Sequence, residues 1–234
     1  DKWVFTIAPI MSMVVALLVF AVIPIGPTVN IFGRLVPLHL ADLPVGLMYM
    51  LAVSSLGVYG IVLGGWASNN KYSLIGGLRS SAQLISYELA LGLSLIGVVM
   101  LTGTLSLVQT VDYQAGSFLN WTVFLQPLGF ILYALTALAE TNRAPFDLPE
   151  AEQELTAGYH TEYSGMKFAL FFMAEYINMI NVSAIAATMF LGGWRPPFAF
   201  IPEWTGPLWL FLKVIILIFI FIWLRATLPR LRYD

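Results

Sequence analysis

Apolar stretches of membrane-spanning length alternate with short polar segments along almost the whole chain. A helix that crosses a bilayer needs about 20 predominantly apolar residues, and the sequence contains six candidates of about this length. They run from Trp3 to Ile23, Pro44 to Trp66, Ser81 to Leu101, Trp121 to Ala139, Met166 to Leu191 and Pro207 to Leu224. The pattern predicts an all-α, polytopic membrane helix bundle with six transmembrane helices, in which residues 1–234 form a single transmembrane domain.

The segment between the fourth and fifth candidates, about residues 140–165, concentrates the acidic residues of the chain. It reads ETNRAPFDLPEAEQELTAGYHTEYSG and holds six of the thirteen acids, namely Glu140, Asp147, Glu150, Glu152, Glu154 and Glu162. Asp147 can cap a short helix, with Pro149 in the first turn and Glu150 completing a capping box. A well-capped, solvated surface helix would explain this pattern too, and the segment should form a loop at the membrane surface.

The basic residues predict the orientation in the membrane, because cytoplasmic loops carry an excess of Lys and Arg. Six spans place both chain ends on one side. Eight of the eleven basic residues fall on that side: Lys2, Lys71, Arg79, Arg143, Lys167, Arg225, Arg230 and Arg232. The other three, Arg34, Arg195 and Lys213, lie on or nearer the opposite side. We therefore expect the termini, a short loop with Lys71 and Arg79, and the acidic loop to face the cytoplasm.

Three glutamates lie within the candidate spans or at their edges: Glu88, Glu140 and Glu175. Glu175 lies about 14 Å into its helix at 1.5 Å per residue, close to the middle of a hydrocarbon core about 30 Å thick. A charge at that depth costs at least about 2.5 kcal/mol, so such residues usually face a bundle interior or water and serve a function. Since burial favours the neutral carboxyl form, these acids could exchange protons near neutral pH. A neutral glutamate that only pins two helices together is the alternative for each.

The composition narrows the possible chemistry. Hydrophobic residues make up 59% of the chain and charged residues 10%, against about 25% charged in soluble domains. The absence of cysteine excludes disulfides and iron–sulfur ligation by this chain, and two histidines make a metal site improbable. His160 could titrate near neutrality, although a solvated loop position would explain it equally well. The net charge of −2 gives no indication of nucleic acid.

Composition and spacing together indicate a proton-handling membrane subunit or a transporter. Three stretches go further: AETNRAPFDLPEAEQELTAGYHTEYSGMKF, WASNNKYSLIGGLRSSAQLISYELALGLSL and RATLPRLRYD. They resemble the long motifs of the quinone-site membrane subunit (the H-type subunit in bacteria) of respiratory complex I, the proton-pumping NADH:quinone oxidoreductase. The family has one more helix at each end, so the resemblance also implies that this chain is a piece of a longer protein.

The resemblance implies a function and a set of site residues. The subunit forms part of a quinone chamber and couples quinone reduction to proton translocation in the bacterial inner membrane. The chamber residues placed by motif match are Lys71, Arg79, Arg143, Asp147, Glu150, Glu152, Glu154, Glu162 and Arg225. Glu88, Glu140 and Glu175 match acids of the proton path. Quinone is the substrate, and this chain alone binds no cofactor. Flavin and iron–sulfur clusters belong to partner subunits, which include peripheral-arm quinone-site subunits and antiporter-like membrane subunits.

Other interpretations of the same residues stay open at this point. The membrane anchor of a membrane-bound hydrogenase or formate hydrogenlyase shares the fold and some of the acids but reduces no quinone. An independent proton-coupled transporter belongs to a different class, and neither an inverted repeat nor a matching pair of broken helices supports it. A purely structural scaffold would leave Glu88 and Glu175 unexplained.

Overall fold

The computed structural model describes residues 2–31, 34–142, 146, 158–198 and 201–229 of the chain. Within these residues the long helices are α1 (Lys2–Phe20), α2 (Gly46–Ala67), α3 (Lys71–Thr102), α6 (Pro127–Glu140), α8 (Gly165–Phe190) and α9 (Gly206–Thr227). All except α6 are long and apolar enough to cross a membrane. The prediction of an all-α polytopic membrane bundle is therefore confirmed.

Short elements connect the long helices. They are the helices α4 (Leu107–Tyr113) and α5 (Thr122–Leu125) and the 3-10 turns η1 (Phe118–Asn120), η2 (Gly158–His160) and η3 (Glu203–Thr205). A small antiparallel hairpin joins β1 (Val29–Ile31) to β2 (Arg34–Val36) in the register Val29 to Val36. The hydrophobic pattern had not indicated this hairpin, because its strands are too short to show an alternation.

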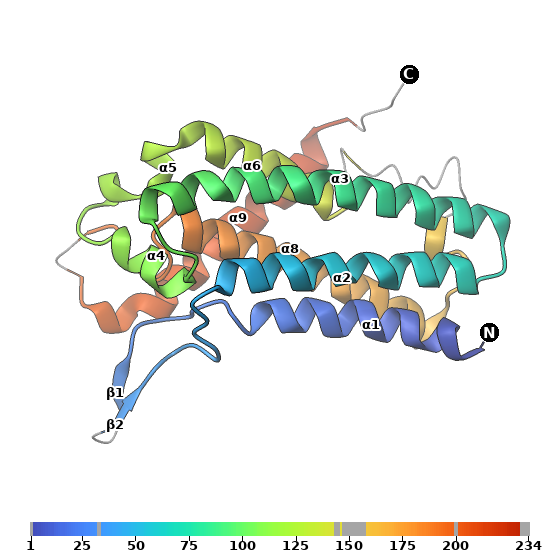
Figure 1. Ribbon diagram of the computed structural model, residues 1–234, viewed down its shortest axis with the longest axis horizontal. Coiled ribbons are helices and arrows are strands. Elements are labelled where there is room, and N and C mark those ends of the chain that lie inside the picture. The colour runs from blue at the N-terminus through green and yellow to red at the C-terminus, as the bar shows by residue number, and fades with distance from the viewer. Residues whose placement is uncertain (1, 32–33, 143–145, 147–157, 199–200, 230–234) are drawn as a thin grey trace.

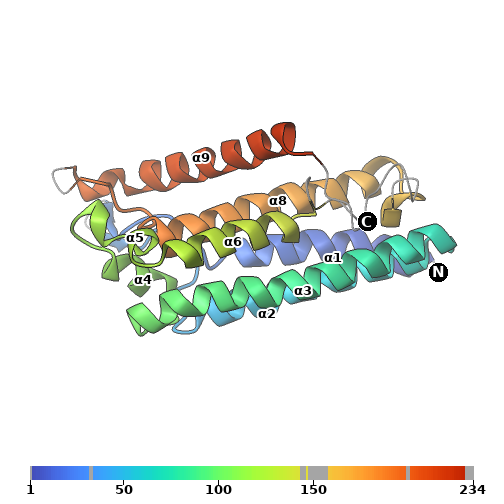
Figure 2. The same cartoon turned by 90° about the horizontal axis from the view of Figure 1, so that it is seen from above.

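The long helices run roughly along one axis, and α8 lies inside the bundle (Figures 1 and 2). Helix α1 packs along α2 and α8, α3 packs along α2 and α6, and α9 packs on α8. In the most apolar part of each helix, 44% of α8 but only 17% of α9 is buried. We call the end with the turn between α2 and α3 and with η2 the loop end. The end with β1, β2, α4 and α5 is the hairpin end.

Glycines permit the close approach of elements near the loop end. A Cβ atom on Gly60 of α2 would overlap the hydroxyl of Ser12 in α1, and one on Gly65 would lie 2.8 Å from the Ser73 carbonyl of α3. Between α3 and η2, a Cβ atom on Gly76 would lie 2.9 Å from the backbone of Gly158. Small residues of this kind let membrane helices pack closely, so that α1, α2, α3 and η2 surround a common space.

Two helices differ from the predicted spans. Helix α3 begins at Lys71 rather than near Ser81, because the side chain of Asn70 accepts a hydrogen bond from the backbone N–H of Tyr72 and caps the helix. Lys71 and Arg79 therefore lie on a helix and not in a loop. The fourth predicted span is divided at Gln126, since Pro127 starts α6 and cannot donate the backbone hydrogen bond that would continue α5.

Candidate functional site

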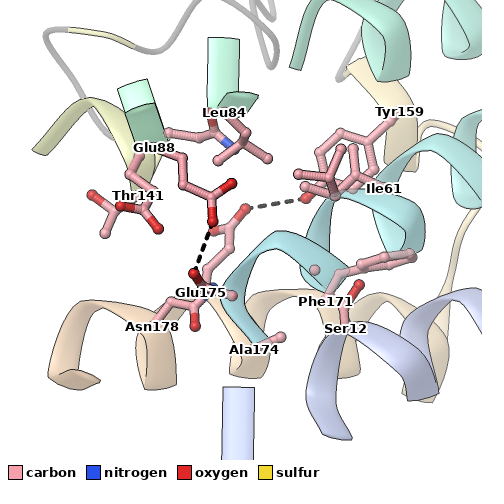
Figure 3. Close-up of a pocket in the computed structure, with 15 residues that line it drawn as sticks. Ser12, Ile61, Leu84, Glu88, Thr141, Tyr159, Phe171, Ala174, Glu175 and Asn178 are labelled. Atoms are coloured by element: carbon pink, nitrogen blue, oxygen red, sulfur yellow. Dashed lines mark hydrogen bonds between the residues drawn. The ribbon is translucent and has the colours of Figure 1, made fainter. Parts of the chain in front are cut away.

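One cavity between the helices is lined by all three of the glutamates singled out from the sequence, Glu88, Glu140 and Glu175. They come from α3, from the last residue of α6 and from α8. The cavity volume is about 60 Å³, and one water needs roughly 10–15 Å³, so several water molecules fit. Figure 3 shows Glu88 and Glu175 extending toward each other from opposite walls. The fold thus brings together three carboxyl groups that are far apart in the sequence.

Hydroxyl groups surround two of these acids. Ser54 and Ser55 of α2 donate hydrogen bonds to the same oxygen of Glu88, at 3.1 and 2.5 Å. The hydroxyl of Tyr159 in η2 donates to Oε1 of Glu175 at 3.2 Å (Figure 3). Each donor can also accept a hydrogen bond from a protonated carboxyl group or from water. The site can therefore hold these acids in either protonation state.

Several polar atoms near this cavity are buried without a hydrogen-bond partner among the described residues. They include Oε2 of Glu140, Nδ1 of His160 and the amide oxygens of Gln83 and Asn181. Buried polar atoms of this kind are normally satisfied by ordered water. The arrangement is typical of a hydrated polar region inside an apolar bundle.

The turn η2 fixes Tyr159 in place. The hydroxyl of Ser73 in α3 donates to the Tyr159 carbonyl at 2.8 Å, and only 1% of Tyr159 is exposed. His160 beside it is also buried and packs against the rings of Phe168 and Phe172. Burial lowers the pKa of His160 to about 4. Both alternatives considered for His160 from the sequence, titration near neutrality and a solvated loop position, were therefore wrong.

The remaining described residues of the predicted chamber lie toward the protein surface. Lys71 is exposed in the first turn of α3, and Arg79 is exposed two turns further along the same helix. Glu162 is exposed and accepts a hydrogen bond of 3.0 Å from the side chain of Asn70. Arg225 is exposed in the last turn of α9. None of these four lines the cavity of the three glutamates.

Part of the predicted chamber lies outside the described residues. This applies to the acids and the arginine of the segment that follows α6, together with the capping box predicted within it. They are Arg143, Asp147, Glu150, Glu152 and Glu154.

Sequence reasoning missed several polar neighbours of the three glutamates. Ser54 and Ser55 are two adjacent hydroxyls in the middle of an apolar span, which is the only sequence signal that could have pointed to them. Tyr159 gave no signal, because its contact with Glu175 depends on how η2 packs. Gln83 and Asn142 lie in the quoted motifs, but their pairing at 3.3 Å across 59 positions is a result of the fold.

A second polar cluster lies at the hairpin end, around the C-terminus of α8. The amide nitrogen of Gln114 donates to the carbonyls of Thr110, Thr188 and Met189, and its oxygen accepts from Thr122 and from the backbone N–H of Gly192. The last carbonyl groups of a helix have no partner within the helix. This cluster supplies those partners from side chains.

Lys213 of α9 completes the same cluster. It is 7% exposed, and its ammonium group donates to the carbonyls of Leu191, Gly193 and Arg195 at 2.7, 2.8 and 2.7 Å. The ring of Trp121 lies 4.3 Å from the same nitrogen, which adds a cation–π contact. All three hydrogens of the ammonium group are used, so this buried charge is satisfied.

The fold and the site define an integral membrane helix bundle with a small polar cavity shared by three carboxyl groups. The family described as NADH dehydrogenase matches residues 1–234, which is the whole sequence. The chain belongs to this family, as its sequence motifs predicted.

Individual relatives agree with the family assignment. The chain is 59% identical to the NADH-quinone oxidoreductase H subunit of Protochlamydia amoebophila over 234 residues, which is all of this chain and 70% of the relative. It is 56% identical over 241 residues to the protein of the same name from Frankia alni. It is 55% identical over 245 residues to the first of the numbered NADH-quinone oxidoreductase H subunits of Geobacter sulfurreducens. The chain spans 52% of the Frankia relative and 69% of the Geobacter one.

Proposed function

We propose that this chain is part of the H-type membrane subunit of a proton-pumping NADH:quinone oxidoreductase. In that role it forms one wall of the quinone chamber and couples quinone reduction to proton translocation. The names of its relatives support this function over that of a hydrogenase anchor or an independent transporter. The observation that carries the proposal is the convergence of Glu88, Glu140 and Glu175 on one cavity.

The energetics of the membrane favour a functional role for these acids. A carboxylate in the hydrocarbon core costs at least about 2.5 kcal/mol, and apolar residues would fill the same space without that cost. Three carboxyl groups around a cavity with space for several water molecules can instead exchange protons with each other through hydroxyl groups and water. Close carboxyl groups titrate as a coupled set, so a change in charge at one is felt by the others.

The proposed chamber lies beside this cavity at the loop end. Lys71, Arg79, Glu162 and Arg225, together with the acidic segment that follows α6, would line it. Quinone takes up two electrons and two protons to become quinol. The electrons would come from flavin and iron–sulfur clusters in partner subunits, and a soluble partner subunit would bind the headgroup.

The proposed coupling is electrostatic. Reduction of the quinone changes the charge in the chamber and draws protons from the surrounding acids. Glu140 is the first residue of the acidic segment, and Tyr159 near the end of that segment donates a hydrogen bond to Glu175. The change in charge would reach the cavity at these two points and pass on to Glu88. From there it would act on antiporter-like partner subunits.

The proposed location is the inner membrane of a bacterium, with the loop end toward the cytoplasm. Both the start of α1 and the end of α9 lie toward this end (Figures 1 and 2). The described basic residues Lys71, Arg79 and Lys167 belong to the same end, as the positive-inside rule requires of a cytoplasmic face. Lys213, by contrast, is used within the fold at the hairpin end.

Replacement of Glu175 by Gln tests the proposal, because Gln keeps the shape of the side chain but cannot release a proton. The variant should be built in the full-length subunit within its assembled complex. Quinone reduction and proton translocation should fall together by at least about tenfold. Unchanged rates in an assembled complex would contradict the proposal.

A matched control is Asp112→Asn, which alters an acid at the hairpin end that pairs with Arg195 at 2.8 Å. This variant should keep both rates. Mass spectrometry of the proteins that co-migrate with the full-length subunit on a native gel is the second test. Flavin and iron–sulfur subunits together with antiporter-like subunits are expected, whereas a nickel–iron hydrogenase subunit would assign the chain to a different complex.

A further inference from the structure

A buried amide on α3 gathers three hydrogen-bond acceptors near the end of α6. Gln83 is 8% exposed, and its Nε2 atom lies 2.9 Å from the carbonyl oxygen of Ala139 and 2.8 Å from that of Phe146. The side-chain oxygen of Asn142 lies 3.3 Å from the same nitrogen. An amide nitrogen carries two hydrogens. The two short bonds therefore use both of them, and the longer contact shares one.

The orientation of this amide follows from its neighbours. If the oxygen and nitrogen of Gln83 were exchanged, an oxygen would face three acceptors and no donor. The amide of Asn142 is oriented by Gln83, because the Gln83 nitrogen needs an acceptor and so faces the Asn142 oxygen. The Asn142 nitrogen then donates to the hydroxyl of Ser80 at 3.3 Å. Ser80, Asn142 and Gln83 thus form one buried, directional chain of hydrogen bonds.

This chain of hydrogen bonds encloses one of the cavity acids. Ala139 and Asn142 stand on either side of Glu140 and Thr141 in the sequence. Asn142 has a left-handed backbone with φ of +50°, a conformation that Asn tolerates better than most residues. Glu140 and Asn142 both line the cavity. Gln83 therefore fixes the backbone before and after Glu140.

The same amide also joins the cavity to the proposed chamber. Phe146 belongs to the acidic segment, and its carbonyl is tied to α3 through Gln83. Helix α3 itself carries Glu88, five residues after Gln83. The oxygen of Gln83 is buried without a partner among the described residues, which is the usual environment of an ordered water. One side chain thus links α3 to the end of α6 and to the acidic segment.

We propose that Gln83 is a positioning residue, which holds Glu140 in the cavity by fixing the backbone on both sides of it. The inference rests on the proposed function and names a residue that this function did not include. Gln83 itself exchanges no proton in this scheme. It sets the distance between the acid at the end of α6 and the acid on α3.

Two substitutions of Gln83 separate positioning from simple packing. Gln83→Leu keeps the volume and removes both donors at every pH. Gln83→Glu has no donor when it is ionised, but its neutral form carries one O–H that can reach a carbonyl. The neutral form gains population as the pH falls. Simple packing predicts that Gln83→Leu keeps its activity. Positioning through a hydrogen-bond donor predicts that Gln83→Leu is impaired at every pH and that Gln83→Glu recovers as its neutral form gains population.

The measurement is the rate of quinone reduction per assembled complex, relative to the unchanged protein at each pH. At about pH 8 both variants should fall about tenfold, as expected for buried acceptors left without a donor. Between about pH 8 and about pH 6, Gln83→Glu should recover by at least about threefold, while Gln83→Leu should not recover. Equal pH profiles for the two variants, or an unchanged rate in Gln83→Leu, would overturn the inference.

Two controls complete the experiment. Gln114→Leu removes a buried amide of the same kind at the hairpin end and should keep its rate per assembled complex. Glu140→Gln distinguishes the two proposals. If it is impaired while Gln83→Leu is not, only the role of Gln83 fails, whereas an unimpaired Glu140→Gln would remove the proposed function as well. Gln83→Asn, whose shorter side chain cannot reach the three acceptors, takes the place of Gln83→Leu if that variant does not assemble, with the same expected profile.

Discussion

The two ends of the bundle treat their buried polar groups in opposite ways. At the hairpin end, Gln114 and Lys213 use their donors on the carbonyl groups around the C-terminus of α8. Around the cavity toward the loop end, an oxygen of Glu140 and an oxygen of Gln83 are buried with no partner among the described residues. The buried donors named at the hairpin end therefore have their partners within the protein, as expected for a structural role. The cavity resembles a site at which water and protons complete the hydrogen bonds.

This difference shows how to interpret polar residues inside a membrane protein. Polarity alone does not indicate function, because Gln114 is only 1% exposed and stabilises the end of α8. Incomplete hydrogen bonding, together with space for water, is the more informative sign. The comparison predicts that substitutions at the hairpin end change stability, whereas substitutions at the cavity change activity.

The largest effect on stability is expected for Gln114→Leu. It leaves two carbonyls of α8 and the backbone N–H of Gly192 without their partner, and each buried group left unpaired costs about 1–3 kcal/mol. We expect a loss of about 3 kcal/mol or more, measured as a lower thermal midpoint of the purified assembly. A midpoint equal to that of the unchanged protein would contradict the structural role of this cluster.

Acidification should have an effect of similar size through His160. Its pKa in the folded protein is about 4 because of burial, against an ordinary value of about 6.5. Between these values the unfolded chain binds a proton and the folded chain does not, so stability is full above about pH 6.5 and falls as the pH drops to about 4. The total loss is about 3 kcal/mol, at 1.36 kcal/mol per pKa unit.

The measurement is the fraction of the complex that remains assembled after heating, determined on native gels at several pH values across this range. His160→Phe should flatten the dependence on pH, because it retains the aromatic packing and cannot be protonated. His39→Phe, which alters the other histidine of the chain, serves as the control and should leave the slope unchanged. The same slope in His160→Phe and in the unchanged protein would rule out this histidine as its source.

A smaller loss, of about 2 kcal/mol, is expected for Lys213→Met, because the substitution also removes the cost of burying a charged ammonium group. The apolar side chain keeps much of the volume but leaves three carbonyls without their shared donor. Lys213→Arg should lie between this variant and the unchanged protein, since a planar guanidinium retains the charge but cannot point three donors in the same directions. The thermal midpoints of the three proteins should therefore fall in the order unchanged protein, Lys213→Arg, Lys213→Met. Any other order would contradict this prediction.

The smallest effect on stability, less than about 1 kcal/mol, is expected for Glu140→Gln. The amide has nearly the same shape and adds its donor beside a cavity with space for water. Proton translocation should nevertheless fall by about tenfold or more. If Glu140→Gln were strongly destabilised but pumped protons normally when assembled, the proposed difference between the two ends would be contradicted.

Hydropathy was sufficient to locate the long helices, because a span of about 20 apolar residues has few alternatives to a membrane helix. It failed where a single local interaction decides the boundary. The cap at Asn70 extends α3 to Lys71, and Pro127 divides the fourth span. The strands β1 and β2 are three residues each, too short for a periodic signal.

The three membrane glutamates were found from the sequence because a carboxyl group is conspicuous among apolar neighbours. Their convergence on one cavity could not be predicted, since it depends on how α3, α6 and α8 are rotated about their axes. The donors Tyr159 and Gln83 were missed for a related reason. Each is an ordinary polar residue, and only the fold shows which groups it faces.

The length of α3 has a consequence for distances above the membrane. At 1.5 Å per residue its 32 residues measure about 48 Å, roughly 18 Å more than the hydrocarbon core. The polar side chains lie at its beginning, from Lys71 to Gln83, so this excess stands outside the lipid at the loop end. Because α3 is one continuous helix, its rise per residue fixes the distances along its axis. The helix places Gln83 near the hydrocarbon boundary and sets the height at which a soluble partner can rest on the turn before α3.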